Sequence, residues 1–257
     1  MTDYLDQLFS LRGRTAVVTG GSSGIGHGIA LALGRAGARL VLVARRPEVL
    51  AAAAAGLAAA GCRADWISAD LGDRAQLERA AGQAADRFGE PDVLVNCAGL
   101  NLRPPLAELT SAQWDQLLAV NLTAPFLLGQ RFGPSMAARG WGRIVNIGSQ
   151  QSVRAFGNSG GYGAAKAGLV ALTRSQSEAW APSGVCCNAI GPGFVATPLT
   201  AAVTADPAAA AALAARTMTG RNGVPADFAG VAVFLASPAS DYVTGQFVCV
   251  DGGFSAS

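Results

Sequence analysis

Short apolar runs rich in β-branched residues alternate with longer Ala- and Leu-rich segments along the whole chain. Apolar strands without polar alternation are typical of a parallel sheet covered by helices on both faces. The alternation therefore predicts an α/β fold, a doubly wound Rossmann-type parallel sheet with right-handed crossovers. The expected strands are Thr15–Thr19, Leu40–Ala44, Ala64–Ser68, Val93–Asn96, Arg143–Ile147, Val185–Ala189 and Phe247–Val250. The expected helices are Ile25–Ala36, Pro47–Ala60, Arg74–Phe88, Ser111–Ala138, Gly161–Ala181 and Pro225–Leu235.

No Pro/Ser-rich linker divides the 257 residues, and 51% of them are apolar, enough for a large core. We therefore expect a single domain over residues 1–257. The one long irregular stretch, residues 191–224, contains Pro192, Pro198 and Pro207. Loops of that length in a compact domain are usually functional, so this stretch is expected to be a substrate lid.

Composition excludes several classes of partner. The net charge is only +2, and no basic run is longer than Arg45-Arg46, which argues against a nucleic-acid partner. The apolar stretches are too short for a membrane span, and the N-terminal residues do not form a signal peptide. Five cysteines without C-x-x-C spacing and the sole histidine, His27, predict no metal site. We expect a cytoplasmic protein.

A glycine-rich sequence, TGGSSGIG, follows the first expected strand at residues 19–26. Glycines at Gly20, Gly24 and Gly26 permit a tight turn and close backbone approach to a pyrophosphate at the N-terminus of the next helix. The spacing G-x-x-x-G-x-G differs from the commoner G-x-G-x-x-G motif. Its position between strand and helix favours a nucleotide-binding loop over ordinary turn glycines.

The second expected strand ends in Arg45-Arg46 rather than in an acidic residue. A carboxylate there would bind the ribose hydroxyls of NAD, whereas a guanidinium pairs well with a 2′-phosphate. The alternative is a pair of solvated arginines. The sequence thus favours NADP, with NAD possible.

Lys166 is the only lysine among 19 basic residues, and it lies four residues after Tyr162. In a helix this spacing places both side chains on one face, where an ammonium group lowers the pKa of a phenol. Ser149 ends the fifth expected strand and suits the binding of a substrate oxygen. Since His27 lies in the glycine-rich turn, a Ser-His-Asp hydrolase is disfavoured.

Two asparagines have alternative explanations. Asn96, in Asn96-Cys97-Ala98-Gly99, closes the fourth strand where ligands bind, but a strand-end turn explains it equally well. Asn121 lies in an apolar helical run, where a buried amide belongs either to a structural network or to a site.

Together these motifs resemble the short-chain dehydrogenase/reductase family from Arg14 to Gly253, with weaker similarity to its gluconate 5-dehydrogenase-like members. The resemblance rests on TGGSSGIG, Asp70-Leu71, NCAG, Asn121, Ser149, YGAAK, NAIGPGFVAT at residues 188–197 and VDGG at residues 250–253. NCAG replaces the usual NNAG, and no basic residue precedes Gly24. The resemblance implies a catalytic tetrad of Asn121, Ser149, Tyr162 and Lys166. It implies cofactor contacts from Gly20, Ser22, Ser23, Gly24, Ile25, Gly26, Arg45, Arg46, Asp70, Leu71, Asn96, Ala98, Gly99, Tyr162, Lys166, Pro192, Gly193, Val195 and Thr197.

The expected reaction interconverts a secondary alcohol and a ketone. Tyr162 would transfer the proton and Ser149 would bind the reacting oxygen. The resemblance implies that Lys166 holds the nicotinamide ribose and that Asn121 positions a water.

The substrate is expected to be a small polar molecule such as a sugar acid or polyol. Substrate contacts are expected from Arg103, Ser149, Gln151, Arg154 and Asn158, with Arg103 gripping a carboxylate. A 3-oxoacyl-[acyl-carrier-protein] reductase and a non-catalytic nucleotide-binding redox sensor are the alternatives. The long helices at residues 111–138 and 161–181 have more apolar surface than one sheet face needs, and the resemblance implies that they pair across a two-fold axis. We therefore expect a homotetramer.

Overall fold

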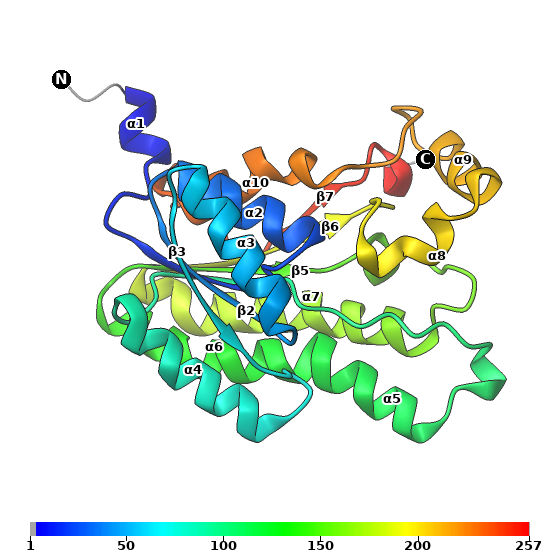
Figure 1. The fold of residues 1–257 in the computed structure, drawn as a ribbon, viewed down its shortest axis with the longest axis horizontal. Coiled ribbons are helices and arrows are strands. Elements are labelled where there is room, and N and C mark those ends of the chain that lie inside the picture. Colours follow the sequence, from blue (N-terminus) through cyan, green and yellow to red (C-terminus); the bar gives the residue numbers. More distant parts are fainter. Residues whose placement is uncertain (1–3, 257) are drawn as a thin grey trace.

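A seven-stranded, wholly parallel sheet with the order β3-β2-β1-β4-β5-β6-β7 forms the centre of the computed structural model (Figure 1). The structure describes residues 4–256, so residues 1–3 and 257 of the predicted domain lie outside the described part. The strand order reverses between β1 and β4, which confirms the doubly wound, single-domain α/β fold. The strands are β1 (Thr15–Thr19), β2 (Arg39–Ala44), β3 (Arg63–Ser68), β4 (Val93–Asn96), β5 (Gly142–Ile147), β6 (Val185–Pro192) and β7 (Phe247–Val250).

Helices cover both faces of the sheet. In Figure 1, α2, α3 and α10 lie on one face and α4 to α7 on the other. The helices are α1 (Tyr4–Phe9), α2 (Gly24–Arg35), α3 (Pro47–Ala59), α4 (Arg74–Phe88), α5 (Ser111–Leu118), α6 (Ala124–Ala138), α7 (Gly160–Trp180), α8 (Ala201–Thr204), α9 (Pro207–Ala215) and α10 (Ala229–Ala236).

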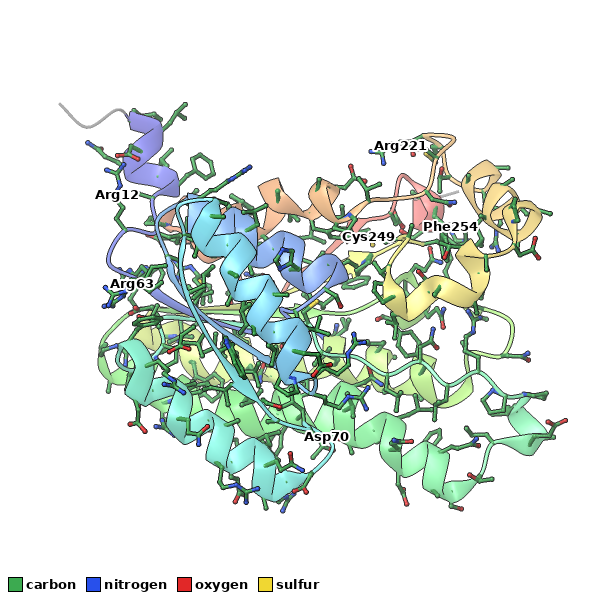
Figure 2. All side chains as sticks on the ribbon, viewed as in Figure 1. Arg12, Arg63, Asp70, Arg221, Cys249 and Phe254 are labelled. Carbon is green, nitrogen blue, oxygen red and sulfur yellow. The ribbon has the colours of Figure 1, made fainter. Side chains whose placement is uncertain are left out.

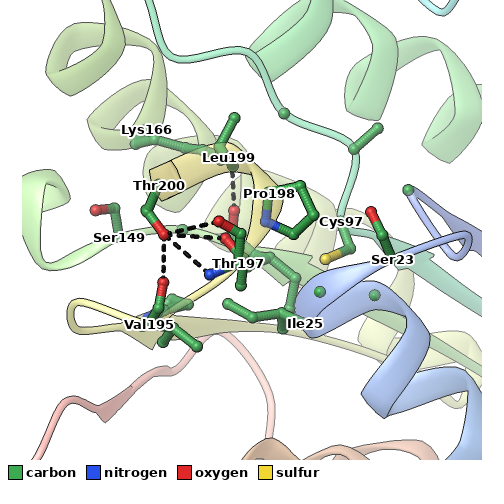
Figure 3. A pocket seen from close by; sticks show the side chains of 18 of the residues that line it. Ser23, Ile25, Cys97, Ser149, Lys166, Val195, Thr197, Pro198, Leu199 and Thr200 are labelled. Atoms are coloured by element: carbon green, nitrogen blue, oxygen red, sulfur yellow. Dashed lines mark hydrogen bonds between the residues drawn. The ribbon is translucent and has the colours of Figure 1, made fainter. Parts of the chain in front are cut away.

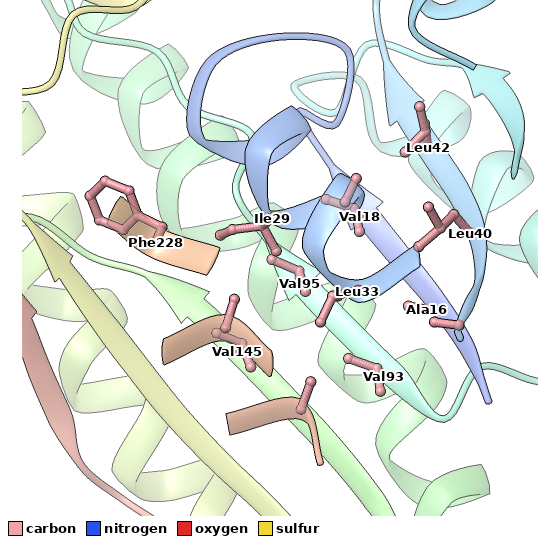
Figure 4. Close-up of a cluster of buried hydrophobic side chains, with 14 of the residues drawn as sticks. Ala16, Val18, Ile29, Leu33, Leu40, Leu42, Val93, Val95, Val145 and Phe228 are labelled. Atoms are coloured by element: carbon pink, nitrogen blue, oxygen red, sulfur yellow. The ribbon is translucent and has the colours of Figure 1, made fainter. Parts of the chain in front are cut away.

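The core beneath α2 fixes the position of the glycine-rich loop. Ile29 and Leu33, four residues apart, turn toward the sheet and are completely buried with Val18 and Val93 of the central strands (Figure 4). Burial of a side chain of this size contributes about 1.5–3 kcal/mol. The start of α2 is therefore held firmly over the end of β1.

The expected single helix over residues 111–138 was wrong in one respect. Between α5 and α6 the chain makes a π-helical turn, Ala119–Thr123, which inserts one extra residue per turn. Asn121 occupies this turn and its Nδ2 donates to the Leu117 carbonyl oxygen at 3.0 Å. A side-chain amide therefore satisfies a carbonyl in the distorted turn.

Two smaller differences from the expected elements lie elsewhere in the chain. Strand β6 continues to Pro192, and the helix expected from Pro225 begins as a 3-10 turn, Pro225–Phe228.

The stretch at residues 191–224 leaves the sheet and returns to its starting point. Val195 and Gly223 form an isolated parallel bridge, and the Gly223 amide donates to the Phe194 carbonyl oxygen at 2.9 Å. Between these points lie α8 and α9, with Phe254 close by (Figure 2).

Within residues 4–256 no single helix has both the length and the apolar character needed to cross a membrane. Only Pro198–Thr204 and Pro207–Ala215 taken together do, and they are bent by 102°.

Candidate active site

The glycine-rich loop lies at the point where the strand order reverses. Gly20 and Gly24 have φ values of 66° and 55°, a region that favours glycine. A Cβ on Gly26 would lie 2.4 Å from the Gly20 carbonyl oxygen, so no other residue fits there. Ser23 caps α2 without a side-chain hydrogen bond, which leaves N–H groups of the first turn available. This cradle fits the pyrophosphate of a dinucleotide.

Two cavities meet at this loop. One of about 190 Å³ extends toward Ser149, and one of about 580 Å³ extends toward the end of β2; Gly20, Ser23, Ala98 and Gly99 line both. Of the residues expected to contact the cofactor, all but Asn96 line one or both cavities. They are Gly20, Ser22, Ser23, Gly24, Ile25, Gly26, Arg45, Arg46, Asp70, Leu71, Ala98, Gly99, Tyr162, Lys166, Pro192, Gly193, Val195 and Thr197.

Asn96 has a different environment. It is 3% exposed, and its Nδ2 donates to Asn146 Oδ1 at 2.8 Å. Asn146 in turn donates to Thr173 Oγ1 and Gln176 Oε1. Asn96 therefore belongs to a buried amide network that joins β4, β5 and α7 below the cavity.

Arg45 and Arg46 are exposed at the outer end of the 580 Å³ cavity. Neither forms an ion pair with a described carboxylate. Both guanidinium groups are therefore available to an anion on a bound ligand.

Ser149, Tyr162 and Lys166 come together at the inner end of the 190 Å³ cavity. Tyr162 and Ser149 line the cavity together and are 8% and 7% exposed, and Ser149 Oγ accepts from the Gln151 amide at 3.1 Å. Lys166 Nζ lies 5.8 Å from the centre of the Tyr162 ring and donates to the Ile147 carbonyl oxygen at 2.7 Å. Figure 3 shows Ser149 and Lys166 on one side of this cavity and Ser23 on the other.

The electrostatics of this group differ from the expectation that Lys166 lowers the phenol pKa. Burial raises the pKa of Tyr162 to about 12, against an opposing effect of the Ser149 hydrogen bond and the charge of Arg103. Burial also lowers the pKa of Lys166 to about 8. The ammonium group is itself removed from water and donates to the Ile147 carbonyl oxygen. Burial is therefore the largest influence on the pKa of both Tyr162 and Lys166. At neutral pH the Tyr162 phenol carries its proton.

Asn121 connects the π-helical turn to the loop after β4. Its Nδ2 donates to the Leu100 carbonyl oxygen at 2.8 Å, and its Oδ1 accepts from the Leu100 amide at 3.3 Å. Both bonds hold the strand-end loop beside Gly99. The predicted role of Asn121 in positioning a water stays a prediction.

The beginning of the 191–224 stretch closes over the glycine-rich loop. Thr200 Oγ1 donates to the Val195 carbonyl oxygen at 2.6 Å and accepts from the Thr197 amide at 3.0 Å (Figure 3). The Thr197 side chain would lie 3.1 Å from a Cβ on Gly24. This segment thus packs directly against the backbone of the glycine turn. Its function as a lid stays a prediction.

A third cavity of about 580 Å³ opens from Ser149 and Tyr162 beneath α8 and α9. Arg103 and Gln151 line it as expected. Arg154 and Asn158 do not: Arg154 donates to the Ser255 carbonyl oxygen, and Asn158 is exposed with φ 54°. Phe156 and Arg216 line the cavity, but no motif in the sequence distinguishes them.

No group of three or more potential metal ligands occurs among the described residues.

Comparisons with known proteins agree with this geometry. A short-chain dehydrogenase/reductase model described as Enoyl-(Acyl carrier protein) reductase matches residues 20–255. Gluconate 5-dehydrogenase of Gluconobacter oxydans (strain 621H) is 39% identical over 250 residues, 97% of this chain and 98% of that protein. The 5-keto-D-gluconate 5-reductase of Escherichia coli (strain K12) is 35% identical over 249 residues, 97% of this chain and 98% of that protein.

One solved structure adds a comparison of the fold. The gluconate 5-dehydrogenase of Burkholderia cenocepacia J2315, in complex with NADP and tartrate, is 37% identical with a TM-score of 0.93, covering 99% of this chain and 100% of that one. Fold, strand-end motifs and family model thus coincide over nearly the whole length. The chain belongs to the short-chain dehydrogenase/reductase family of oxidoreductases.

Proposed function

We propose that this protein is an NADP-dependent oxidoreductase that interconverts a secondary alcohol and a ketone on a sugar acid or related polyol. The observation that carries the proposal is the buried Tyr162–Ser149 pair with Lys166 beside it. This group lies where the cavity of the glycine-rich loop meets the cavity beneath α8 and α9. A dinucleotide and a small substrate would meet at these side chains.

When bound, the nicotinamide supplies or accepts the hydride. In reduction Tyr162, which holds its proton at neutral pH, donates it to the carbonyl oxygen. The Ser149 hydroxyl hydrogen-bonds the same oxygen and stabilises its developing charge. Lys166 supplies a buried positive charge next to the phenol, and Asn121 holds the adjoining loop.

A sugar-acid substrate is supported by two independent observations. The relatives named above are gluconate 5-dehydrogenases and a 5-keto-D-gluconate 5-reductase. The cavity beneath α8 and α9 presents side-chain amides and the guanidinium of Arg103 close to Tyr162.

A substrate panel read by NADPH absorbance tests this function. We expect turnover of 5-keto-D-gluconate and little turnover of a 3-oxoacyl thioester. The opposite preference would favour the acyl-carrier-protein reductase, and no turnover of any ketone would favour a non-catalytic nucleotide sensor.

Arg45 is proposed to bind the 2′-phosphate of NADP. Loss of a charge-assisted hydrogen bond costs about 1.5–3 kcal/mol. Arg45→Ala should therefore weaken NADP binding more than about tenfold and leave NAD binding nearly unchanged. Titration of each cofactor by fluorescence measures this, with Arg35→Ala, an exposed arginine at the end of α2, as the control for charge. Equal affinity of the unmodified protein for NADP and NAD would contradict the assignment.

We further propose a cytoplasmic homotetramer. Trp114 on α5 and Phe126 on α6 are 38% and 40% exposed, which suits a helical interface between subunits. Strand β7 at the sheet edge offers a second contact surface. Light scattering at micromolar concentration should give four times the 25.8 kDa mass of one chain, and a monomeric mass would refute the assembly.

A further inference from the structure

The cavity beneath α8 and α9 has an unbalanced charge. Two guanidinium groups, Arg103 and Arg216, line it, and no Asp or Glu does. No described carboxylate forms an ion pair with either arginine. Two unpaired cations facing one small cavity favour an anionic ligand.

Arg216 is held in place by aromatic rings rather than by hydrogen bonds. Its guanidinium carbon lies 4.3 Å from the centre of the Phe254 ring and 5.5 Å from that of Phe156. These rings are 6.5 Å apart, and Phe254 is 5% exposed. Stacking orients the plane of a guanidinium while its N–H donors stay free.

Arg103 also lies over Phe156, with its guanidinium carbon 5.0 Å from the ring centre, but it has a hydrogen bond as well. Its Nη2 donates to the Gly157 carbonyl oxygen, and its charge lowers the pKa of Tyr162. Arg103 therefore uses one donor on the backbone, whereas no hydrogen bond among the described residues occupies the donors of Arg216.

Three buried amide oxygens around the same cavity have no hydrogen-bond partner. They are Asn101 Oδ1, Gln150 Oε1 and Gln151 Oε1, and Gln150 is only 5% exposed. A buried acceptor without a partner costs about 1–3 kcal/mol, so such groups usually meet a donor on a ligand. Hydroxyl groups are donors of suitable size.

We propose that Arg216 binds the substrate carboxylate at the end of the cavity away from Tyr162, while the three amides accept hydrogen bonds from the intervening hydroxyl groups. The inference rests on the proposed function and assigns a residue to its specificity. The substrate is then a polyhydroxylated acid whose reacting carbon is remote from its carboxyl group.

Steady-state kinetics on two matched ketones tests Arg216 in the NADPH-loaded enzyme. 5-Keto-D-gluconate carries the carboxylate, and L-sorbose carries a CH2OH group in its place. For Arg216→Gln we expect the KM for 5-keto-D-gluconate to rise more than about tenfold, because a charge-assisted pair is lost. Its kcat, and both constants for L-sorbose, should change less than about twofold. Arg216→Lys should restore part of the affinity.

The control is Arg79→Gln, which removes the same charge from the exposed face of α4. It should leave the kinetics of both ketones unchanged. An equal loss of activity on both ketones in Arg216→Gln would mean that the residue only supports the fold, and would overturn the proposal.

A binding measurement separates this inference from the proposed function. Calorimetric titration of tartrate into the NADP-loaded protein reports on a carboxylate site without turnover. We expect the unmodified protein and Arg79→Gln to bind tartrate, and Arg216→Gln to bind it more than about tenfold more weakly. If no ketone is reduced but this difference remains, the proposed function fails and the carboxylate site stands. If the unmodified protein binds tartrate no better than Arg216→Gln, the assignment of Arg216 is wrong.

Discussion

Tyr162→Phe is expected to lower kcat at least about a hundredfold, since positioned proton transfer contributes about 10²–10⁴ to a rate. The phenol lines the same cavity as Ser149, and burial keeps it protonated at neutral pH. Removing one oxygen leaves a ring of the same shape, so the packing of α7 and the affinity for NADPH should change little. Single-turnover kinetics and NADPH titration measure the two effects separately.

Tyr242→Phe is the matched control, because Tyr242 is fully exposed to solvent. It should retain normal turnover. Near-normal kcat in Tyr162→Phe, or a parallel loss of NADPH binding and melting temperature, would remove Tyr162 from the proposed mechanism.

Lys166→Arg should also abolish measurable turnover although it keeps the positive charge. Lys166 is 3% exposed, and its ammonium fits against the Ile147 carbonyl oxygen. A planar guanidinium is larger and cannot adopt the same contact in a closed site. We expect weaker cofactor binding as well, because Lys166 lines the cavity of the glycine-rich loop.

The chain has no second lysine, so the control is the reverse exchange, Arg174→Lys, on the exposed face of the same helix. It should leave kcat and cofactor affinity unchanged. Substantial activity in Lys166→Arg would show that charge alone suffices at this position.

The strand pattern could be predicted from the sequence because most of the strands are short apolar runs between turn residues. The interruption of the helix at Ala119–Thr123 could not, since a single π-helical turn leaves the apolar pattern almost unchanged. Asn121 is the only local indication of it, as a polar residue whose amide must find buried partners.

The site was predictable where a residue acts through its position on a strand end or a helix. Ser149, Tyr162 and Lys166 meet as their spacing indicates. Long-range contacts could not be predicted in this way. The side chain of Asn96 is buried and hydrogen-bonded to Asn146. The guanidinium of Arg154 donates to the carbonyl oxygen of Ser255, 101 residues away in sequence.

The Val195–Gly223 bridge makes the intervening segment a unit with fixed ends. Because both ends meet at this isolated bridge beyond the end of β6, a change in the length of residues 196–222 alters loop-closure entropy only slightly. Residues of this segment also line the cavity beneath α8 and α9, so a change within it reshapes that cavity while Ser149, after β5, and Tyr162 and Lys166, on α7, stay in place.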